Sequence, residues 1–337
     1  MAHLTWETVT LKLRNPFRLS YGVSDTRQAF IIRLQGDAGY GEGTIAPYYG
    51  IKPEDMIACW QAAAEKKEPL PDTVEEIPAW VGTSGPATAR CALELALYDR
   101  IGRMRNEPLY KLLGLPRPQA MPTSFTISID TPQAMARMAR RISKFPNIKV
   151  KLGSDDDEAR LAAIREARPD ARLRVDANAG WTYEEALVRL ERLERFRLEM
   201  IEQPLKWDQI EAMGELQKRT SIPIVADESV QTLEDVERLA DAGVRGVNLK
   251  LMKVGGLSPA LKMLRRAYER GMRVMLGCMI ETSLGTTAMT HMAGLADWVD
   301  LDAPMLISND PFEGVQYDDR AWITLPDRPG IGALPRK

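Results

Sequence analysis

The stretch Ile148-Lys149-Val150-Lys151-Leu152-Gly153 places two lysines inside a run that otherwise has the composition of a buried strand. Side chains alternate along a strand, so Lys149 and Lys151 share one face and the apolar residues share the other. One interpretation is a half-exposed edge strand that carries lysines toward solvent. The other is a strand with helices on its outer face and a polar inner face. The residues downstream favour the second interpretation.

Beyond residue 120, short apolar segments alternate with segments of helical length. We predict eight strands, at Ser124–Ile127, Ile148–Leu152, Leu173–Asp176, Met200–Glu202, Ile224–Asp227, Gly246–Lys250, Val274–Gly277 and Trp298–Asp302. Regular alternation of strand and helix implies parallel strands, and eight of them close into a barrel. The span is short for a complete barrel, so we expect the eighth helix to be absent or replaced. The predicted fold class is therefore α/β, a modified TIM barrel of the form (β/α)7β.

The first 113 residues follow a different pattern, which predicts an α+β unit. An antiparallel meander is expected over 5–14, 29–35 and 39–43, and helices are expected over 53–66 and 86–113. The proline-rich segment 113–122 is a natural boundary. We therefore predict three parts: an α+β capping domain with specificity loops at 1–115, a catalytic barrel at 116–305, and a C-terminal segment at 306–337 that returns to the capping domain.

Composition excludes several classes of function. The formal net charge of −2 gives no overall field for nucleic acid or an anionic membrane. Three widely spaced cysteines argue against a disulfide framework. The start of the chain lacks a signal-peptide pattern, and no apolar run is long enough to span a bilayer. We expect a cytoplasmic protein that acts on a small molecule, and homo-oligomerisation stays open. Because only His3 and His291 occur, histidine triads and histidine metal sites are nearly excluded.

Three acidic residues end three consecutive predicted strands. Asp176, Glu202 and Asp227 lie one strand–helix unit apart, so their carboxylates should converge at the face where such barrels place active sites. Any one of them alone would be interpreted as a turn residue or a helix N-cap. Three like charges in one place repel each other unless a cation compensates them. A hard divalent cation with open positions for water or substrate, such as Mg²⁺, suits these ligands.

Lys250 ends the next predicted strand, on the far side of the acids from Lys149 and Lys151. An ammonium group near a metal ion and a second ammonium is destabilised, so we expect its pKa to fall from the reference of about 10.4. Two opposed lysines can remove a proton from one face of a carbon and return a proton to the other face. A racemase or an epimerase requires this arrangement.

The order of these motifs is similar to that of a known family. Lys-x-Lys at 149–151, Asp-Ala-Asn at 176–178, Glu-Gln-Pro at 202–204, Ala-Asp-Glu-Ser at 226–229, Asn-Leu-Lys at 248–250 and Gly-Gly at 255–256 resemble the enolase superfamily. Within it they are most like the dipeptide epimerases of the muconate-lactonizing subgroup. The N-terminal meander and the segment 92–99 resemble the capping domain of that family.

The resemblance implies a set of roles for these residues. One Mg²⁺ ion would be bound by Asp176, Glu202 and Asp227. Lys151 and Lys250 would be the acid/base pair, and Lys149 would assist electrostatically. No other cofactor is implied.

Further segments bear on the substrate. Asp300-Leu301-Asp302 puts two carboxylates on one face of the last strand. In dipeptide epimerases a matching motif holds the free α-ammonium of the dipeptide. The alternative interpretation of Asp300 and Asp302 is an acidic loop exposed to solvent. The segment 277–282, with Cys278 and Ile280, resembles one that contacts the substrate carboxylate through its backbone.

Two cap segments, 17–26 and 46–52, correspond to the specificity loops of the family. Tyr21 would line the substrate pocket. Ser24 stands where one branch acting on Ala-Glu carries an arginine, which argues against Ala-Glu as the substrate. Arg18 and Arg27 lie nearby, and both are also compatible with a strand surface.

These observations together predict an isomerase: a Mg²⁺-dependent dipeptide epimerase that inverts the α-carbon of the C-terminal residue through a metal-stabilised enediolate. Other members of the subgroup use the same enolate chemistry, and they are the alternative: an o-succinylbenzoate synthase, an N-acylamino acid racemase or a cycloisomerase. A remoter alternative is a metal-binding barrel without catalysis.

Overall fold

The computed structural model describes residues 3–337 and contains an eight-stranded parallel barrel. Its strands follow one another around the sheet in chain order: β5 (Ser124–Ile127), β6 (Asn147–Lys151), β7 (Arg172–Asp176), β8 (Leu198–Glu202), β9 (Ile224–Ala226), β10 (Gly246–Leu249), β11 (Arg273–Gly277) and β12 (Trp298–Asp300). The eight predicted strands are confirmed, with ends that differ by no more than two residues.

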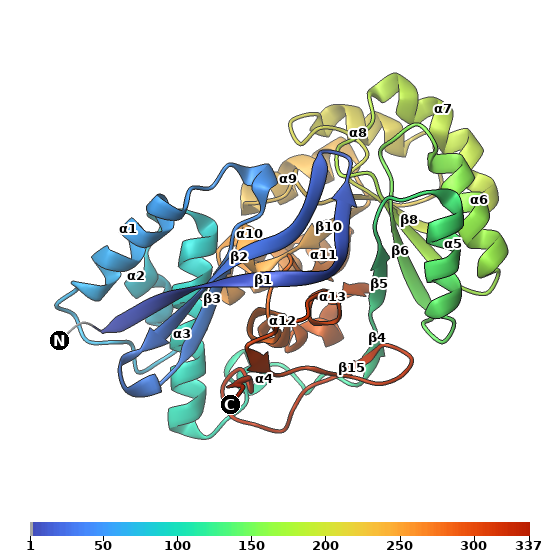
Figure 1. Ribbon diagram of the computed structural model, residues 1–337. Coiled ribbons are helices and arrows are strands. Elements are labelled where there is room, and N and C mark those ends of the chain that lie inside the picture. The colour runs from blue at the N-terminus through green and yellow to red at the C-terminus, as the bar shows by residue number, and fades with distance from the viewer. Residues whose placement is uncertain (1–2) are drawn as a thin grey trace.

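Helices cover the outside of the barrel, as Figure 1 shows most clearly for α5 to α8. They are α5 (Pro132–Arg141), α6 (Asp157–Ala167), α7 (Tyr183–Leu193), α8 (Ile210–Gln217), α9 (Leu233–Ala242), α11 (Leu257–Glu269) and α12 (Ser283–Thr290). Two short helices, α10 (Leu251–Val254) and α13 (Ala303–Leu306), follow β10 and β12 and contact the cap. The segment after β12 holds only the four-residue α13 where a full eighth helix would stand. The (β/α)7β prediction is therefore confirmed.

The opening stretch shows how the sequence produces this architecture. Ile148 and Val150 are fully buried against the helical layer, while the two lysines on the other face of β6 are buried inside the barrel. The edge-strand interpretation is thus wrong, because β6 pairs with β5 on one side and with β7 on the other. The starts of two helices are also set by neighbouring residues in the sequence, because Thr182 and Thr232 form capping boxes at α7 and α9.

The seam between β12 and β5 is joined by hydrogen bonds that involve side chains. Leu301 N donates to Thr123 Oγ1 at 2.7 Å, and Thr126 N donates to Asp302 Oδ2 at 2.7 Å. From β7, Arg174 Nη1 reaches across to Val299 O at 3.0 Å. Polar side chains therefore hold the first and last strands together, and one of them belongs to the predicted substrate site.

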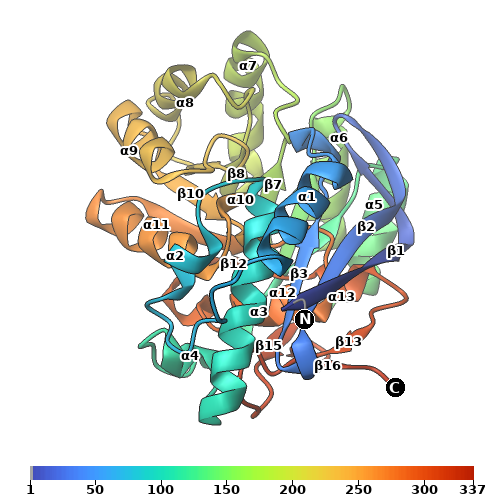
Figure 2. The same ribbon diagram turned by 90° about the vertical axis from the view of Figure 1, so that its left-hand side faces the viewer.

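The capping domain contains a three-stranded antiparallel sheet with helices on one side (Figure 2). Its elements are β1 (Leu4–Leu19), β2 (Gly22–Leu34), β3 (Tyr40–Thr44), α1 (Pro53–Ala64), α2 (Ile77–Val81), α3 (Ala87–Arg105) and α4 (Leu109–Leu112). The predicted meander is confirmed. At Gly41 the sheet and α3 approach so closely that an added Cβ would lie 1.8 Å from Ala92 O.

Two details of the cap differ from expectation. The segment 17–26 is mostly a paired hairpin rather than a loop, because the β1–β2 ladder resumes at Phe17–Ser24 and continues to Leu19–Gly22. The predicted helix over 86–113 is two helices, because Asn106 takes a left-handed conformation (φ 52°) that ends α3. The hairpin reaches from the cap across to the barrel (Figure 1), where Ser20 Oγ donates to Asn178 O at 2.8 Å.

The C-terminal segment contacts both parts of the molecule. Its strands and one strand of the linker are short: β4 (Met121–Pro122), β13 (Phe312–Glu313), β14 (Gln316–Tyr317), β15 (Trp322–Thr324) and β16 (Leu334–Pro335). In the cap, Asp99 of α3 accepts hydrogen bonds from Ile331 N at 2.9 Å and from Tyr40 N at 3.0 Å. These contacts support the predicted return of the chain to the cap, while the domain boundaries at 115 and 305 stay a prediction.

Short 3-10 helices complete the inventory: η1 (Gln35–Asp37), η2 (Pro47–Tyr49), η3 (Glu194–Phe196) and η4 (Ala293–Leu295). Among residues 3–337, no helix combines the length and the apolar character needed to cross a membrane.

Candidate active site

A cavity opens at the carboxyl ends of the barrel strands, beneath the cap; we call it the mouth cavity. The predicted site residues that line it are Tyr21, Lys149, Lys151, Asp227, Lys250, Cys278, Ile280, Asp300 and Asp302. Asp176 and Glu202 are fully buried beside Lys149. Ser24 does not line the cavity, and its hydroxyl donates to Thr26 O at 2.6 Å.

The three predicted metal-binding acids end three neighbouring strands. Asp176 on β7 pairs in register with Glu202 on β8, and on its other side with Lys151 on β6. Glu202 pairs with Val225 on β9, so Asp227 follows two residues beyond that level. The strand register therefore brings the three carboxylates to one end of the barrel, as the sequence predicts.

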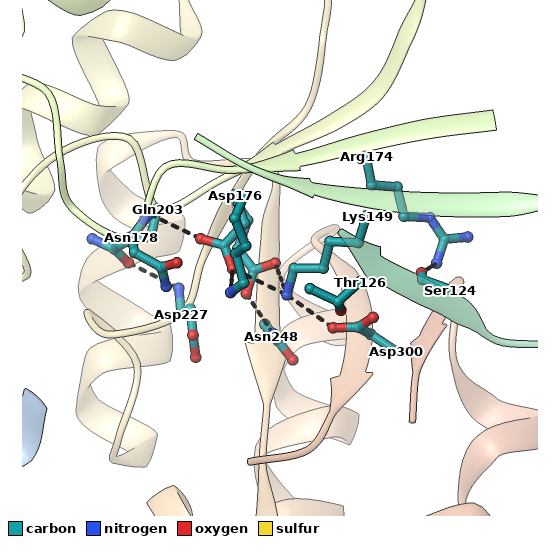
Figure 3. A network of polar contacts seen from close by, with 12 residues as sticks. Ser124, Thr126, Lys149, Arg174, Asp176, Asn178, Gln203, Asp227, Asn248 and Asp300 are labelled. Atoms are coloured by element: carbon teal, nitrogen blue, oxygen red, sulfur yellow. Dashed lines mark hydrogen bonds and ion pairs between the residues drawn. The ribbon is translucent and has the colours of Figure 1, made fainter. Parts of the chain in front are cut away.

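Lys149 lies among these acids with only 2 % of its surface exposed. Its Nζ is 2.8 Å from Asp300 Oδ2 and 3.1 Å from Asp176 Oδ2 (Figure 3). It is also 2.7 Å from Glu202 Oε2. Burial alone would lower the pKa of Lys149, but the three carboxylates more than offset it and hold the pKa well above its ordinary value. Lys149 is therefore a fixed cation.

The two predicted proton carriers each pair with one acid. Lys151 Nζ is 2.6 Å from Asp176 Oδ2, and Lys250 Nζ is 2.7 Å from Asp227 Oδ2. Lys151 ends β6 and Lys250 follows β10, which lies four strands further around an eight-stranded barrel. The two ammonium groups consequently approach the mouth cavity from opposite sides.

The predicted fall in the pKa of Lys250 supposes a bound metal ion beside it and therefore stays a prediction; the contacts with the chain itself act in the other direction. Burial lowers its pKa, but the carboxylates of Asp227 and Glu202 outweigh burial and raise the pKa above its usual value. The same contacts act on the acids. For Asp176, burial favours the neutral form, yet Lys151 and Lys149 prevail and bring the pKa to about 2. The charges at the mouth are thus paired with one another.

Two buried residues that the predicted site omits belong to this cluster. Lys253 Nζ donates to Asp227 Oδ1 at 2.6 Å and to Asn248 O at 2.8 Å, and it also contacts Asp227 O. The sequence feature that could have indicated Lys253 is its position three residues after Lys250. Because α10 forms over these residues, both lysines face Asp227. Glu228 lines the mouth cavity, where burial and then Asp227 raise its pKa to about 8.

Arg27 is a third residue whose position the sequence left open. It lies on the face of β2 that carries Ala29, which packs against Ile280 of the barrel, and it lines the mouth cavity. Burial lowers its pKa. Within residues 3–337 its guanidinium makes no hydrogen bond or ion pair, so this cation is free to meet an anionic group. Arg18, in contrast, pairs with Asp130 on the surface.

The donor set at the mouth fits a hard divalent cation. Oxygens of Asn178, Glu202, Glu228 and Asn248 are buried without a hydrogen-bond partner in the described chain, although Glu202 Oε2 is ion-paired with Lys149. Oxygen ligands of this kind suit Mg²⁺. Within residues 3–337, no three acidic, cysteine or histidine side chains already surround one metal-sized position, since lysine ammonium groups lie between the carboxylates. The metal ligands therefore stay a prediction.

Taken together, a parallel barrel with acids and lysines at its strand ends, covered by an α+β cap, has the architecture of the enolase superfamily. Comparison with known families agrees. The model described as enolase C-terminal domain-like matches residues 133–337, and that of the mandelate racemase / muconate lactonizing enzyme N-terminal domain matches residues 1–114. This chain belongs to that family, and the resemblance predicted from its motifs is confirmed.

Individual relatives are similar over nearly the whole chain. An L-Ala-D/L-Glu epimerase from Bacteroides thetaiotaomicron is 36 % identical over 337 residues, which cover 98 % of this chain and 87 % of the relative. The crystal structure of a dipeptide epimerase from Cytophaga hutchinsonii, complexed with Mg and D-Ala-L-Val, has a TM-score of 0.91 at 31 % identity, covering 99 % of this chain and 95 % of that one. An N-succinyl Arg/Lys racemase from Bacillus cereus also has a TM-score of 0.91, at 29 % identity and the same coverage.

The buried ion cluster predicts how Lys149 affects stability. Lys149→Met leaves three buried carboxylates without their shared cation, so we expect the free energy of unfolding to fall by about 3–5 kcal/mol. Urea denaturation in EDTA measures the change. Lys144→Met is the matched control, because its pair with Asp319 is 66 % and 64 % exposed and should contribute about 1 kcal/mol or less. Equal effects of the two substitutions would contradict the role of Lys149.

Proposed function

We propose that this protein is a Mg²⁺-dependent dipeptide epimerase that inverts the α-carbon of the C-terminal residue. Dipeptide epimerase activity is supported by the names of the relatives and by the dipeptide bound in a similar structure. The observation that carries the mechanism is a single cavity. Lys151 and Lys250 line it from opposite sides of the barrel, and Asp300 and Asp302 line it from the last strand.

The two lysines supply the proton transfers. One removes the α-proton of the C-terminal residue, and the other delivers a proton to the opposite face of the same carbon. In the described arrangement their charges are neutralised by Asp176 and Asp227. The same carboxylates are the proposed metal ligands, so a bound Mg²⁺ would compete with the two ammonium groups for them. The mechanism requires the lysine that accepts the α-proton to be neutral and the opposite one to be protonated.

Asp176, Glu202 and Asp227 would hold the metal. Bound there, Mg²⁺ supplies Lewis-acid chemistry, because it offsets the negative charge that develops on the substrate carboxylate as the α-proton leaves. Lys149 is not proposed as a proton carrier, because three carboxylates hold its ammonium group in place. Its fixed positive charge makes the cluster of carboxylates less negative.

Asp300 and Asp302 are proposed to hold the α-ammonium of the dipeptide. Asp300 Oδ1 is buried without a hydrogen-bond partner in the described chain, which makes it an acceptor for such a group. Cys278 lies beside it, with Sγ 3.3 Å from Asp300 O, and is proposed with Ile280 to meet the substrate through its backbone. At the cap, the unpaired Arg27 would be the counter-ion of an acidic side chain on the C-terminal residue, a role that Ser24 does not offer.

A second candidate is an N-acylamino acid racemase. The similarity to a structure of an N-succinyl Arg/Lys racemase favours it. The reaction at the α-carbon would be the same, but an N-acylated amino acid carries no free ammonium. The two candidates therefore differ in what Asp300 and Asp302 have to do, which makes these residues the place to separate them. No specific observation favours a synthase or a cycloisomerase over these two.

The lysine mechanism predicts that Lys151→Ala and Lys250→Ala each lower dipeptide epimerisation by about 10³-fold or more, because each removes one of two obligatory proton carriers. Polarimetry or chiral chromatography measures the loss. Any exchange of the α-proton with deuterated water that survives should be confined to one stereoisomer, and the two variants should retain opposite ones. Exposed Lys206 is the control, and Lys206→Ala should behave as the unaltered protein. Full activity in either site variant would refute the mechanism.

The ammonium site predicts that Asp300→Asn and Asp302→Asn raise KM for dipeptides by about tenfold or more, because each removes a charge partner of the substrate. The same variants should turn over N-succinyl amino acids no worse than the unaltered protein does. Steady-state kinetics with both substrate classes measures the contrast. If dipeptides are inert with the unaltered protein while N-succinyl amino acids are racemised, the second candidate is correct.

A further inference from the structure

A second cavity adjoins the mouth cavity, between the cap hairpin and the first strand and helix of the barrel. It has a volume of about 550 Å³. Phe17, Thr126 and Leu306 line both cavities, so these residues form the boundary between them. We call the second one the bulge cavity, because the residues of a β-bulge in β1 line it. None of the proposed catalytic residues lines the bulge cavity.

The bulge is built into β1 and fixed at both ends. Between the paired positions Lys12–Thr26 and Phe17–Ser24 the ladder loses register, so β1 carries extra residues there. On one side of the bulge, Leu13 forms a bridge with Ile307. On the other side, Ile129 N donates to Arg18 O at 3.1 Å. The cap strand is thereby attached to the barrel on both sides of a space that it leaves open.

The position of the bulge cavity relates it to the proposed ammonium site. Thr126 lines both cavities, and its N–H donates to Asp302 Oδ2 at 2.7 Å. If Asp300 and Asp302 hold the α-ammonium of a dipeptide, the α-carbon beside that ammonium lies close to Thr126, at the boundary that the two cavities share. The C-terminal residue extends from there toward the lysines, and the N-terminal side chain has the bulge cavity beside it.

The chemistry of the lining defines the side chain that fits. Its floor is apolar, with Phe125 and Ile127 from β5 and Met135 and Met138 from α5. Its rim carries three cations and one acid, Arg14, Arg18, Arg141 and Asp130. Asp130 pairs with Arg18, whereas within residues 3–337 neither Arg14 nor Arg141 makes an ion pair or a side-chain hydrogen bond, so the rim is net positive. An apolar side chain gains by leaving water for such a floor, whereas a cationic one meets like charge.

We propose that the bulge cavity binds the side chain of the N-terminal residue of the substrate, and that it selects large apolar residues and rejects lysine and arginine. This inference rests on the proposed dipeptide epimerase function and names its substrate class. It assigns specificity for the two residues of the dipeptide to different places. The mouth cavity selects the C-terminal residue, whose α-carbon is inverted, and the bulge cavity selects the N-terminal residue, which is unchanged.

The test compares dipeptides that differ only at the N-terminal residue: Leu-Glu, Ala-Glu and Lys-Glu. With the unaltered protein we expect kcat/KM to be about tenfold or more higher for Leu-Glu than for Ala-Glu, and lowest for Lys-Glu. Ala134 on α5 lines the bulge cavity, and Ala134→Trp fills it. This variant should lower kcat/KM for Leu-Glu by about tenfold, mainly through KM, and leave Ala-Glu within about twofold.

The neighbouring residue supplies the matched control. Gln133 lies on the same helix but is exposed and does not line the cavity, so Gln133→Trp should leave all three substrates unchanged. A second variant tests the rim without filling the space: Arg14→Glu should raise kcat/KM for Lys-Glu and leave Ala-Glu unchanged. These expected results all concern the relative use of substrates, which a general loss of folding does not alter.

Two results would overturn the inference while leaving the proposed function intact. One is epimerisation of Leu-Glu and Ala-Glu with equal efficiency by the unaltered protein. The other is an Ala134→Trp variant that lowers both substrates equally or neither of them. Failure of the proposed function looks different, because the unaltered protein would then exchange the α-proton of no dipeptide at all.

Discussion

The compensation of buried charge at the barrel mouth is the constraint on which the rest of this structure depends. Asp176, Glu202, Asp227 and Asp300 are all buried there, and an uncompensated buried ion costs several kcal/mol. Lys149 offsets this cost by bridging carboxylates from three strands, while Lys151, Lys250 and Lys253 each pair with one acid. Because Lys149 on β6 meets acids of β7, β8 and β12, these charges are satisfied only when the barrel is complete and in register.

The same constraint prepares the site for its proposed chemistry. The lysines that neutralise the acids are the groups proposed to carry protons, so in the proposed mechanism metal binding and proton transfer would depend on the same carboxylates. Lys253 has a different role from Lys151 and Lys250. It holds both the side chain and the backbone of Asp227, and it bonds Asn248 O as well, which fixes that acid between β9 and β10. We interpret it as a positioning residue for the metal ligand.

Buried polar contacts also attach the cap to the barrel. Glu42 of β3 accepts hydrogen bonds from Thr282 N at 2.8 Å, Thr282 Oγ1 at 2.7 Å and Gly285 N at 3.0 Å, at the start of α12. The cap is therefore tied to the segment that follows Cys278 and Ile280 in the mouth cavity. Specificity can change in the hairpin while this attachment and the barrel chemistry stay the same.

Features with a strong local pattern were predictable from the sequence. The eight strands, the acids at their ends and the two lysines of β6 follow from periodicity and spacing. Lys253 and Arg27 were not, because their roles depend on which way a short helix and a hairpin turn them. The bulge in β1 was missed for a similar reason: Arg14-Asn15-Pro16 resembles an ordinary turn until its two attachments to the barrel are known.

Deuterium incorporation at α-carbons tests the central claim most directly. A library of dipeptides is incubated in deuterated water with the protein and Mg²⁺, and with the protein and EDTA, and is then analysed by mass spectrometry. The account predicts exchange of one deuterium, at the C-terminal residue, from both stereoisomers, and only when Mg²⁺ is present. Exchange that persists in EDTA, exchange at the N-terminal residue, or no exchange in any member of the library would contradict it.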